Sequence, residues 1–121
     1  MSTDYSIENL DGITTIRLAR QLGLKEILGV IDEVAARGGY SRRLWEVSGK
    51  LDFTSGEIET IAEHGKVTWP DPARVAYVAT DPLSFGLLRM LEVYRDQQDY
   101  ETRVFRSEQD ALEWLRAWER A

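Results

Sequence analysis

The sequence predicts one α/β domain over residues 1–121, with a mixed five-stranded sheet, an amino-terminal antiparallel hairpin and about four helices. Two short β-like runs flank an Asp-Gly pair near the start of the chain. After them, segments with apolar residues at helical spacing alternate with short apolar runs to the end of the chain. Strands joined through helices pair in parallel, because such crossovers are right-handed. The hairpin is therefore expected at one edge of an otherwise parallel sheet.

The hairpin is predicted over Tyr5–Leu10 and Ile13–Leu18. Asp11 and Gly12 lie between the two runs and supply the positive φ angles that a two-residue turn requires. The second run alternates between two sets of side chains, so we expect one of its faces to meet solvent.

The first helix is predicted from apolar residues at helical spacing between Leu24 and Ala35, with charged residues between them. Gly38 and Gly39 are expected to end this helix, since glycine tolerates the left-handed conformation that follows a last turn. A third strand is predicted over Arg43–Ser48.

A shorter second helix is predicted over Ser55–Glu63, with Gly65 closing it and a loop over Lys66–Ala73. The run Val75–Ala79 is apolar on both of its faces. This pattern is typical of an inner strand that is covered on both sides.

The third helix is predicted over Pro82–Asp96, because the carboxylate of Asp81 can cap free backbone donors and proline suits the first helical position. A fifth strand is predicted over Glu101–Phe105. Ser107 is expected to cap a last helix, whose apolar side consists of Ala111, Leu112, Trp114, Leu115 and Trp118.

The composition excludes several classes of protein. The chain carries 15 basic and 21 acidic side chains and a formal charge of −6, so binding to nucleic acid is not expected. The absence of cysteine excludes disulfides and thiol catalysis. No apolar run is long enough to span a membrane, and the first residues lack the pattern of a signal peptide. A cytoplasmic location is therefore expected.

No pattern of catalytic residues is evident, so we expect neither enzymatic activity nor a metal or other cofactor. His64 is the single histidine, and a position in the last turn of its helix, where positive charge is favoured, explains it more simply than metal binding. An enzyme would instead show a cleft with two perturbed carboxylates, for instance around Asp52 and Glu57.

The most informative short motif lies at the start of the second helix. Thr54 as N-cap and Glu57 three residues later form a capping box. Ser55 then lies in the first turn, where a phosphate would face unpaired N–H groups and carry about two negative charges. Thr54, Ser55 and Gly56 therefore mark either a helix start alone or a phosphorylation and partner site.

The third helix carries more apolar residues than one packing face needs. Either it is buried between other elements, or part of it meets a partner. We predict a homodimer, in which two copies of this small domain meet through a self-complementary surface. The residues proposed for a dimer or ligand surface are Phe85, Leu88, Arg89, Met90 and Tyr94.

Three arginines, Arg37, Arg42 and Arg43, bracket the turn before the third strand. They are either a solvated turn near a helix end, where cations are favoured, or a site for an anionic group.

The order of these segments resembles the SpoIIAA-like proteins, small bacterial relatives of STAS domains, whose fold is also similar to the lipid-binding SEC14 (CRAL-TRIO) domain. The likeness covers about 5–117. Three stretches carry it: the strand 74–79 leading into 81–86, the pair Arg89-Met90, and 103–107 running into 110–115.

The resemblance implies a SpoIIAA-like (STAS) fold and a non-enzymatic regulatory or protein-binding role, as in anti-sigma-factor antagonists. In those antagonists a phosphorylatable serine opens the second helix within an Asp-Ser-Ser-Gly-like motif. Ser55-Gly56 matches its serine and glycine, while Phe53 occupies the position of the aspartate. The SEC14 likeness implies an alternative, the binding of a lipid or other apolar small molecule in a pocket lined by Phe53, Trp69, Phe85 and Met90.

Overall fold

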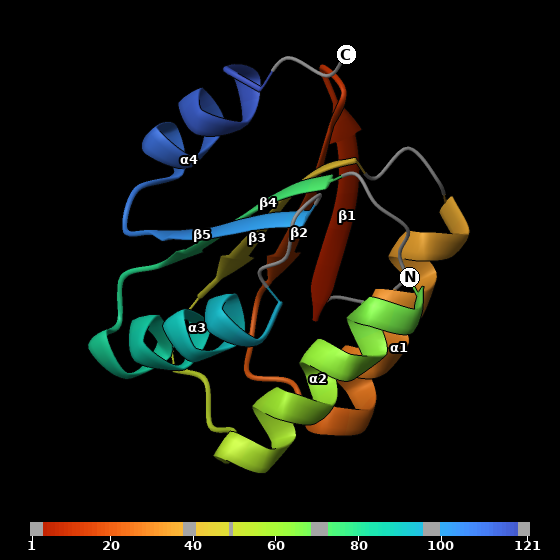
Figure 1. The fold of residues 1–121 in the computed structure, drawn as a ribbon, viewed down its shortest axis with the longest axis vertical. Helices are drawn as coiled ribbons and strands as arrows, with labels where there is room; N and C mark the ends of the chain where they lie inside the picture. The colour runs from red at the N-terminus through yellow and green to blue at the C-terminus, as the bar shows by residue number, and fades with distance from the viewer. Residues whose placement is uncertain (1–3, 38–40, 49, 69–72, 96–99, 119–121) are drawn as a thin grey trace.

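A computed structural model of the chain describes residues 4–37, 41–48, 50–68, 73–95 and 100–118 (Figure 1). Five strands and four helices follow one another in the predicted order. They are β1 (Tyr5–Leu10), β2 (Ile13–Leu18), α1 (Leu24–Arg37), β3 (Arg42–Val47), α2 (Ser55–Thr68), β4 (Ala73–Ala79), α3 (Pro82–Arg95), β5 (Tyr100–Phe105) and α4 (Glu108–Arg116).

The strands form one sheet in the order β1-β2-β3-β4-β5. β1 pairs with β2 in the antiparallel sense, and all other neighbours are parallel. The prediction of a mixed five-stranded α/β sheet is therefore confirmed. Because β2 to β5 run in one direction and a helix follows each of them, the amino ends of all four helices lie at the same end of the sheet.

The hairpin turn is formed as its sequence predicts. Asp11 and Gly12 have φ angles of 54° and 77°, and they connect the paired residues Leu10 and Ile13. Positive φ at both central residues matches the twist of the two strands that the turn joins.

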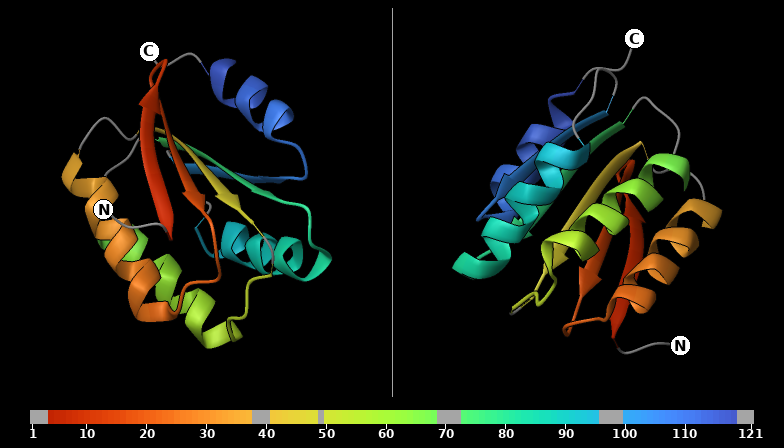
Figure 2. Two further views of the ribbon diagram at one scale, coloured as in Figure 1. Left: turned by 180° about the vertical axis from the view of Figure 1, so that it is seen from behind. Right: turned by 60° about the horizontal axis from the view of Figure 1, so that its bottom comes forward.

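The helices cover the sheet unequally, since α1, α2 and α3 lie on one face and α4 lies on the other (Figures 1 and 2). The larger core lies under the three helices and includes Ile16, Trp45 and Tyr77 from the sheet. A smaller core under α4 contains Ile13, Leu44, Ala76, Val78, Ala111 and Leu115.

The cover provided by α4 overturns one expectation. The face of β2 that was expected to meet solvent is largely buried, since Ile13 is buried and Thr15 is only 8% exposed. Ile13 packs in the same cluster as Ala111 and Leu115 of α4. On this face only Arg17 remains half-buried.

The second helix is longer than predicted, because it continues through Gly65 to Thr68. Gly65 therefore does not end the helix, and the predicted loop begins no earlier than residue 69. Gly65 is buried at the contact between α2 and α3, where an added Cβ would lie 3.2 Å from Nε of Arg95. Close approach of the two helices, rather than helix termination, explains this glycine.

Several expectations fall on residues outside the described part. They are the role of Gly38 and Gly39 in ending α1, and the pocket position of Trp69. Within the described residues, no helix is long and apolar enough to cross a membrane.

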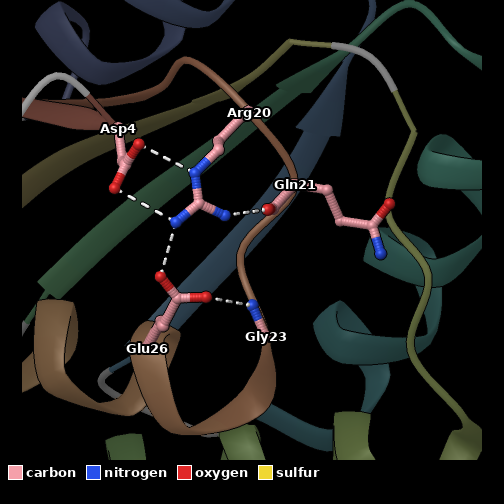
Figure 3. A network of polar contacts seen from close by, with 5 residues as sticks. All are labelled: Asp4, Arg20, Gln21, Gly23 and Glu26. Atoms are coloured by element: carbon pink, nitrogen blue, oxygen red, sulfur yellow. Dashed lines mark hydrogen bonds and ion pairs between the residues drawn. The ribbon is translucent and has the colours of Figure 1, made fainter.

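A polar network ties the segment before β1 to the start of α1 (Figure 3). Arg20 pairs with Asp4 at 2.8 Å and with Glu26 at 2.7 Å. Glu26 also accepts a hydrogen bond from the Gly23 N–H at 3.0 Å. This backbone bond first, and Arg20 second, lower the pKa of the Glu26 carboxyl. The contacts cap α1 at its exposed amino end.

Candidate functional site

The start of α2 is a complete capping box, as predicted. The Glu57 N–H donates to Oγ1 of Thr54 at 3.1 Å, and the Thr54 N–H donates to Oε1 of Glu57 at 2.9 Å. Ser55 is the first residue of the helix, and both Ser55 and Gly56 are exposed. The structure therefore presents the Ser55 side chain at the surface of a firmly capped helix end.

The loop before α2 is joined to the start of α3. The N–H of the buried Leu51 donates to Oγ of Ser84 at 2.7 Å. The Ser84 N–H in turn donates to Oδ2 of Asp81 at 3.0 Å, which confirms Asp81 as the cap of α3. The two helices lie side by side on the same face of the sheet (Figure 2, right). The loop before Ser55 is thus held against the first turn of α3.

The buried face of α3 consists of Ser84, Leu88, Leu91 and Arg95. Leu88, which we placed in a dimer or ligand surface, is therefore part of the interior and not of the outer surface.

The other predicted residues of α3 are divided between its outer face and its packed side. Leu83 is 58% exposed, Val93 71% and Tyr94 37%. Arg89 is exposed and pairs with Glu92 at 3.2 Å. Phe85 and Met90 are half-buried against the larger core. The sequence prediction is thus divided between an exposed apolar surface and a packed interior.

A cavity of about 60 Å³ lies between the sheet and the three helices. Phe53 and Leu88 line it, whereas Phe85 and Met90 are not among the described residues that do so. Pockets for drug-sized ligands usually reach about 300 Å³ or more. The cavity is therefore too small for the lipid that the SEC14 likeness implies.

Two buried arginines contact Tyr100 in the larger core, on the face of the sheet that α1, α2 and α3 cover. Arg43 donates to the Tyr100 hydroxyl, and the Arg95 guanidinium lies 3.6 Å from the centroid of the Tyr100 ring. Burial lowers the pKa of Arg43, and burial first of all raises the pKa of the neighbouring Tyr77. A buried pair of cations is uncommon, because charged groups are costly to remove from water.

Sequence reasoning missed Arg95, although a signal for it exists. Arg95 follows Leu88 by seven residues and Leu91 by four, so it occupies the same buried stripe of α3. A charged residue at such a position marks either a buried pair or a site.

The three arginines Arg37, Arg42 and Arg43, which lie at the end of α1 and the start of β3, do not converge on one anion. Arg37 pairs with Glu33 at 2.9 Å. Arg42 donates to the carbonyl oxygens of Leu115 and Trp118 at the end of α4. Arg43 is fully buried, so the interpretation of all three as a solvated turn is wrong.

His64 does not lie in the last turn of its helix, because α2 continues to Thr68. Its Nε2 lies 2.7 Å from Oδ1 of Asp32, so it connects α2 to α1. Among the described residues, no group of three or more acidic, histidine or cysteine side chains is arranged to hold a metal ion.

A pair of carboxylates that share one arginine has opposed pKa shifts. They are Glu46 of β3 and Glu108 of α4, which Arg17 contacts at 2.6 Å and 2.5 Å. Burial raises the pKa of Glu46, whereas the hydrogen bond from Arg17 lowers that of Glu108. Arg17 of β2 lies between the two carboxylates, so these ion pairs connect the start of α4 to the sheet.

The comparison with known proteins establishes the fold of this chain and does not establish its function. No family model matches the sequence, and no curated protein matches it. A solved structure of similar fold is "Structure of the Anti-Sigma Factor Antagonist SpoIIAA in its Unphosphorylated Form". The similarity has a TM-score of 0.57 at 15% sequence identity and covers 96% of this chain and 99% of that chain. The chain therefore has the fold of SpoIIAA, the STAS fold that the family resemblance implies.

Proposed function

We propose that this chain is a non-enzymatic, STAS-like regulatory module that binds a partner protein through the amino end of α2. The observation that carries the proposal is the exposed Ser55 at the first position of a helix that Thr54 and Glu57 cap. SpoIIAA, which shares this fold, is an anti-sigma factor antagonist. An antagonist-like role in the cytoplasm is the specific form of the proposal.

Modification of Ser55 would change this surface without unfolding the domain. A phosphate there would meet the free N–H groups of the first helical turn, which favour an anion. The capping box and the hydrogen bond from Leu51 to Ser84 hold the helix start in place independently of the Ser55 hydroxyl. The added charge would therefore act on a partner rather than on the fold.

The environment of the acidic residues supports the non-enzymatic part of the proposal. Glu57 belongs to the capping box, and Glu46 and Glu108 both bind Arg17. Asp52, the remaining candidate, is exposed. Glu46, Glu57 and Glu108 have structural roles in the geometry described above, which differs from that of an acid and base pair around a substrate.

Capture of proteins from cells of the source organism tests the proposal. The bait proteins are wild type, Ser55→Asp and the control Ser6→Asp, which adds the same charge at an exposed serine on the edge strand β1. We expect at least one protein to be captured equally by wild type and Ser6→Asp, and at least fivefold less or more by Ser55→Asp. Identical capture by all three baits would contradict the proposal.

Self-association is the second part of the proposed function. We expect two copies to meet through the exposed apolar residues Leu83, Val93 and Tyr94 of α3. Sedimentation equilibrium at micromolar concentration should give twice the 13.9 kDa of one chain. Leu83→Asp should give the monomer, whereas Leu10→Asp, at a similarly exposed leucine of β1, should leave the dimer intact. A monomeric wild-type protein would refute this part.

A further inference from the structure

We propose that the cavity beneath α1, α2 and α3 binds a short aliphatic carboxylate, with the Arg95 guanidinium holding the carboxylate group and the apolar walls holding the hydrocarbon part. This site goes beyond partner binding and does not depend on it. It would give the domain a small-molecule ligand.

The Arg95 side chain carries the argument. Arg95 is 2% exposed and forms part of the cavity wall. Neither Nη1 nor Nη2 has a hydrogen-bond partner within the described part of the chain. The Tyr100 ring lies against the guanidinium and attracts its charge, but it offers the two Nη groups no carboxylate. Arg95 therefore contributes to the cavity wall a buried, positively charged side chain whose two Nη groups have no hydrogen-bond partner within the described residues.

A carboxylate is the group that matches the hydrogen-bond donors of the Arg95 guanidinium. Its two oxygens accept two parallel hydrogen bonds from a guanidinium, which is the strongest common arrangement for arginine. One guanidinium in a mostly apolar wall matches a single negative charge. Tyr77 also lines the cavity, and since burial raises the pKa of its hydroxyl, the phenol stays protonated and able to donate.

The size of the cavity selects a small ligand. A volume of about 60 Å³ corresponds to roughly five water-sized positions, at about 10–15 Å³ for each. Butyrate, with six heavy atoms, is therefore near the upper limit, and a long acyl chain is excluded. Much of the wall is hydrocarbon, to which the three helices contribute Ile27, Ile58 and Leu91.

The route into the cavity passes the start of α2. Of the described residues that line the cavity, Phe53 alone is half-buried, while the others are buried. Phe53 immediately precedes the capping residue Thr54. A ligand would therefore enter where the loop meets α2.

Gly65 sets the position of the guanidinium. An added Cβ at this residue would lie 3.2 Å from Nε and 3.7 Å from Cζ of Arg95. Glycine thus lets the arginine side chain lie directly against α2. Gly65→Ala should displace Arg95 and weaken ligand binding without removing the charge.

An NMR titration of the wild-type protein tests the site. Acetate, butyrate, octanoate and the neutral butyramide are added at constant ionic strength. We expect butyrate to bind in the millimolar range, to shift the Arg95 Nε–H signal, and to show nuclear Overhauser contacts with methyl groups of Ile27 and Leu91. Butyramide should bind at least tenfold more weakly, and octanoate should not enter the cavity.

Variants separate this site from adventitious binding. Arg95→Met and Gly65→Ala should each weaken butyrate binding at least tenfold. Arg89→Met, which removes an exposed arginine from the same helix, should leave it unchanged. The proposal is overturned by butyrate binding that Arg95→Met retains, by equal responses to butyrate and butyramide, or by a response that grows with chain length through octanoate. It is also overturned if butyrate does not shift the Arg95 Nε–H signal of the wild-type protein. That measurement does not depend on whether any variant folds.

Discussion

Replacement of Arg95 by methionine is expected to raise the free energy of unfolding by about 1–3 kcal/mol. Arg95 is 2% exposed, and its two Nη groups have no hydrogen-bond partner within the described residues. A buried charge without a partner is costly, and methionine fills a similar volume without that cost. The loss of the contact with the Tyr100 ring removes part of the gain, which is why the expected increase is modest.

Urea denaturation at pH 7 measures this effect, with Arg89→Met as the matched control. Arg89 lies on the outer face of α3 and pairs with Glu92, so its replacement should change stability by no more than about 0.5 kcal/mol. If Arg95→Met instead destabilised the protein by more than 1 kcal/mol, the Arg95 guanidinium would have to form stabilising hydrogen bonds in the folded protein in solution, which would contradict the prediction. An increase would identify Arg95 as a residue that lowers the stability of the fold, which is typical of a functional site.

Replacement of Leu115 by alanine is expected to lower the free energy of unfolding by about 3 kcal/mol. Leu115 is fully buried in the smaller core, where α4 contributes only Leu115 and Ala111 as buried residues. Removal of its side chain leaves a cavity in a cluster with few other members. The same change also weakens the attachment of α4, which covers this face of the sheet.

The same denaturation experiment with Leu112→Ala provides the control. Leu112 lies on the same helix but is only half-buried, so its truncation should cost about 1 kcal/mol. Hydrogen exchange should also show faster exchange along α4 in Leu115→Ala. Equal losses in the two variants would mean that α4 is not held by this core.

Local signals in the sequence account for most of the predicted fold. The positive φ angles of Asp11 and Gly12 depend on two residues. The caps at Asp81 and Thr54 likewise depend on contacts within three residues of the helix start. Interactions over such short distances along the chain can be recognised without knowing the tertiary structure.

Features that depend on tertiary packing were predicted wrongly or missed. Gly65 has the residue type of a helix end, but the contact with Arg95 keeps it inside α2. Arg43 resembles a surface residue, yet Tyr100, 57 residues away, receives its hydrogen bond in the interior. The cover of β2 by α4 likewise involves elements from opposite ends of the chain. The location of a cavity cannot be deduced from any one of these segments.

Crosslinking in living cells tests most directly whether the amino end of α2 contacts a partner protein. A photoreactive benzoylphenylalanine is placed at Glu59, which is exposed and lies one helical turn after Ser55, and in a separate protein at Glu8 on β1. We predict a covalent adduct with a second protein from position 59, which Ser55→Asp alters, and none from position 8. Adducts of equal yield from both positions, or none from position 59 in a folded protein, would contradict the proposed function.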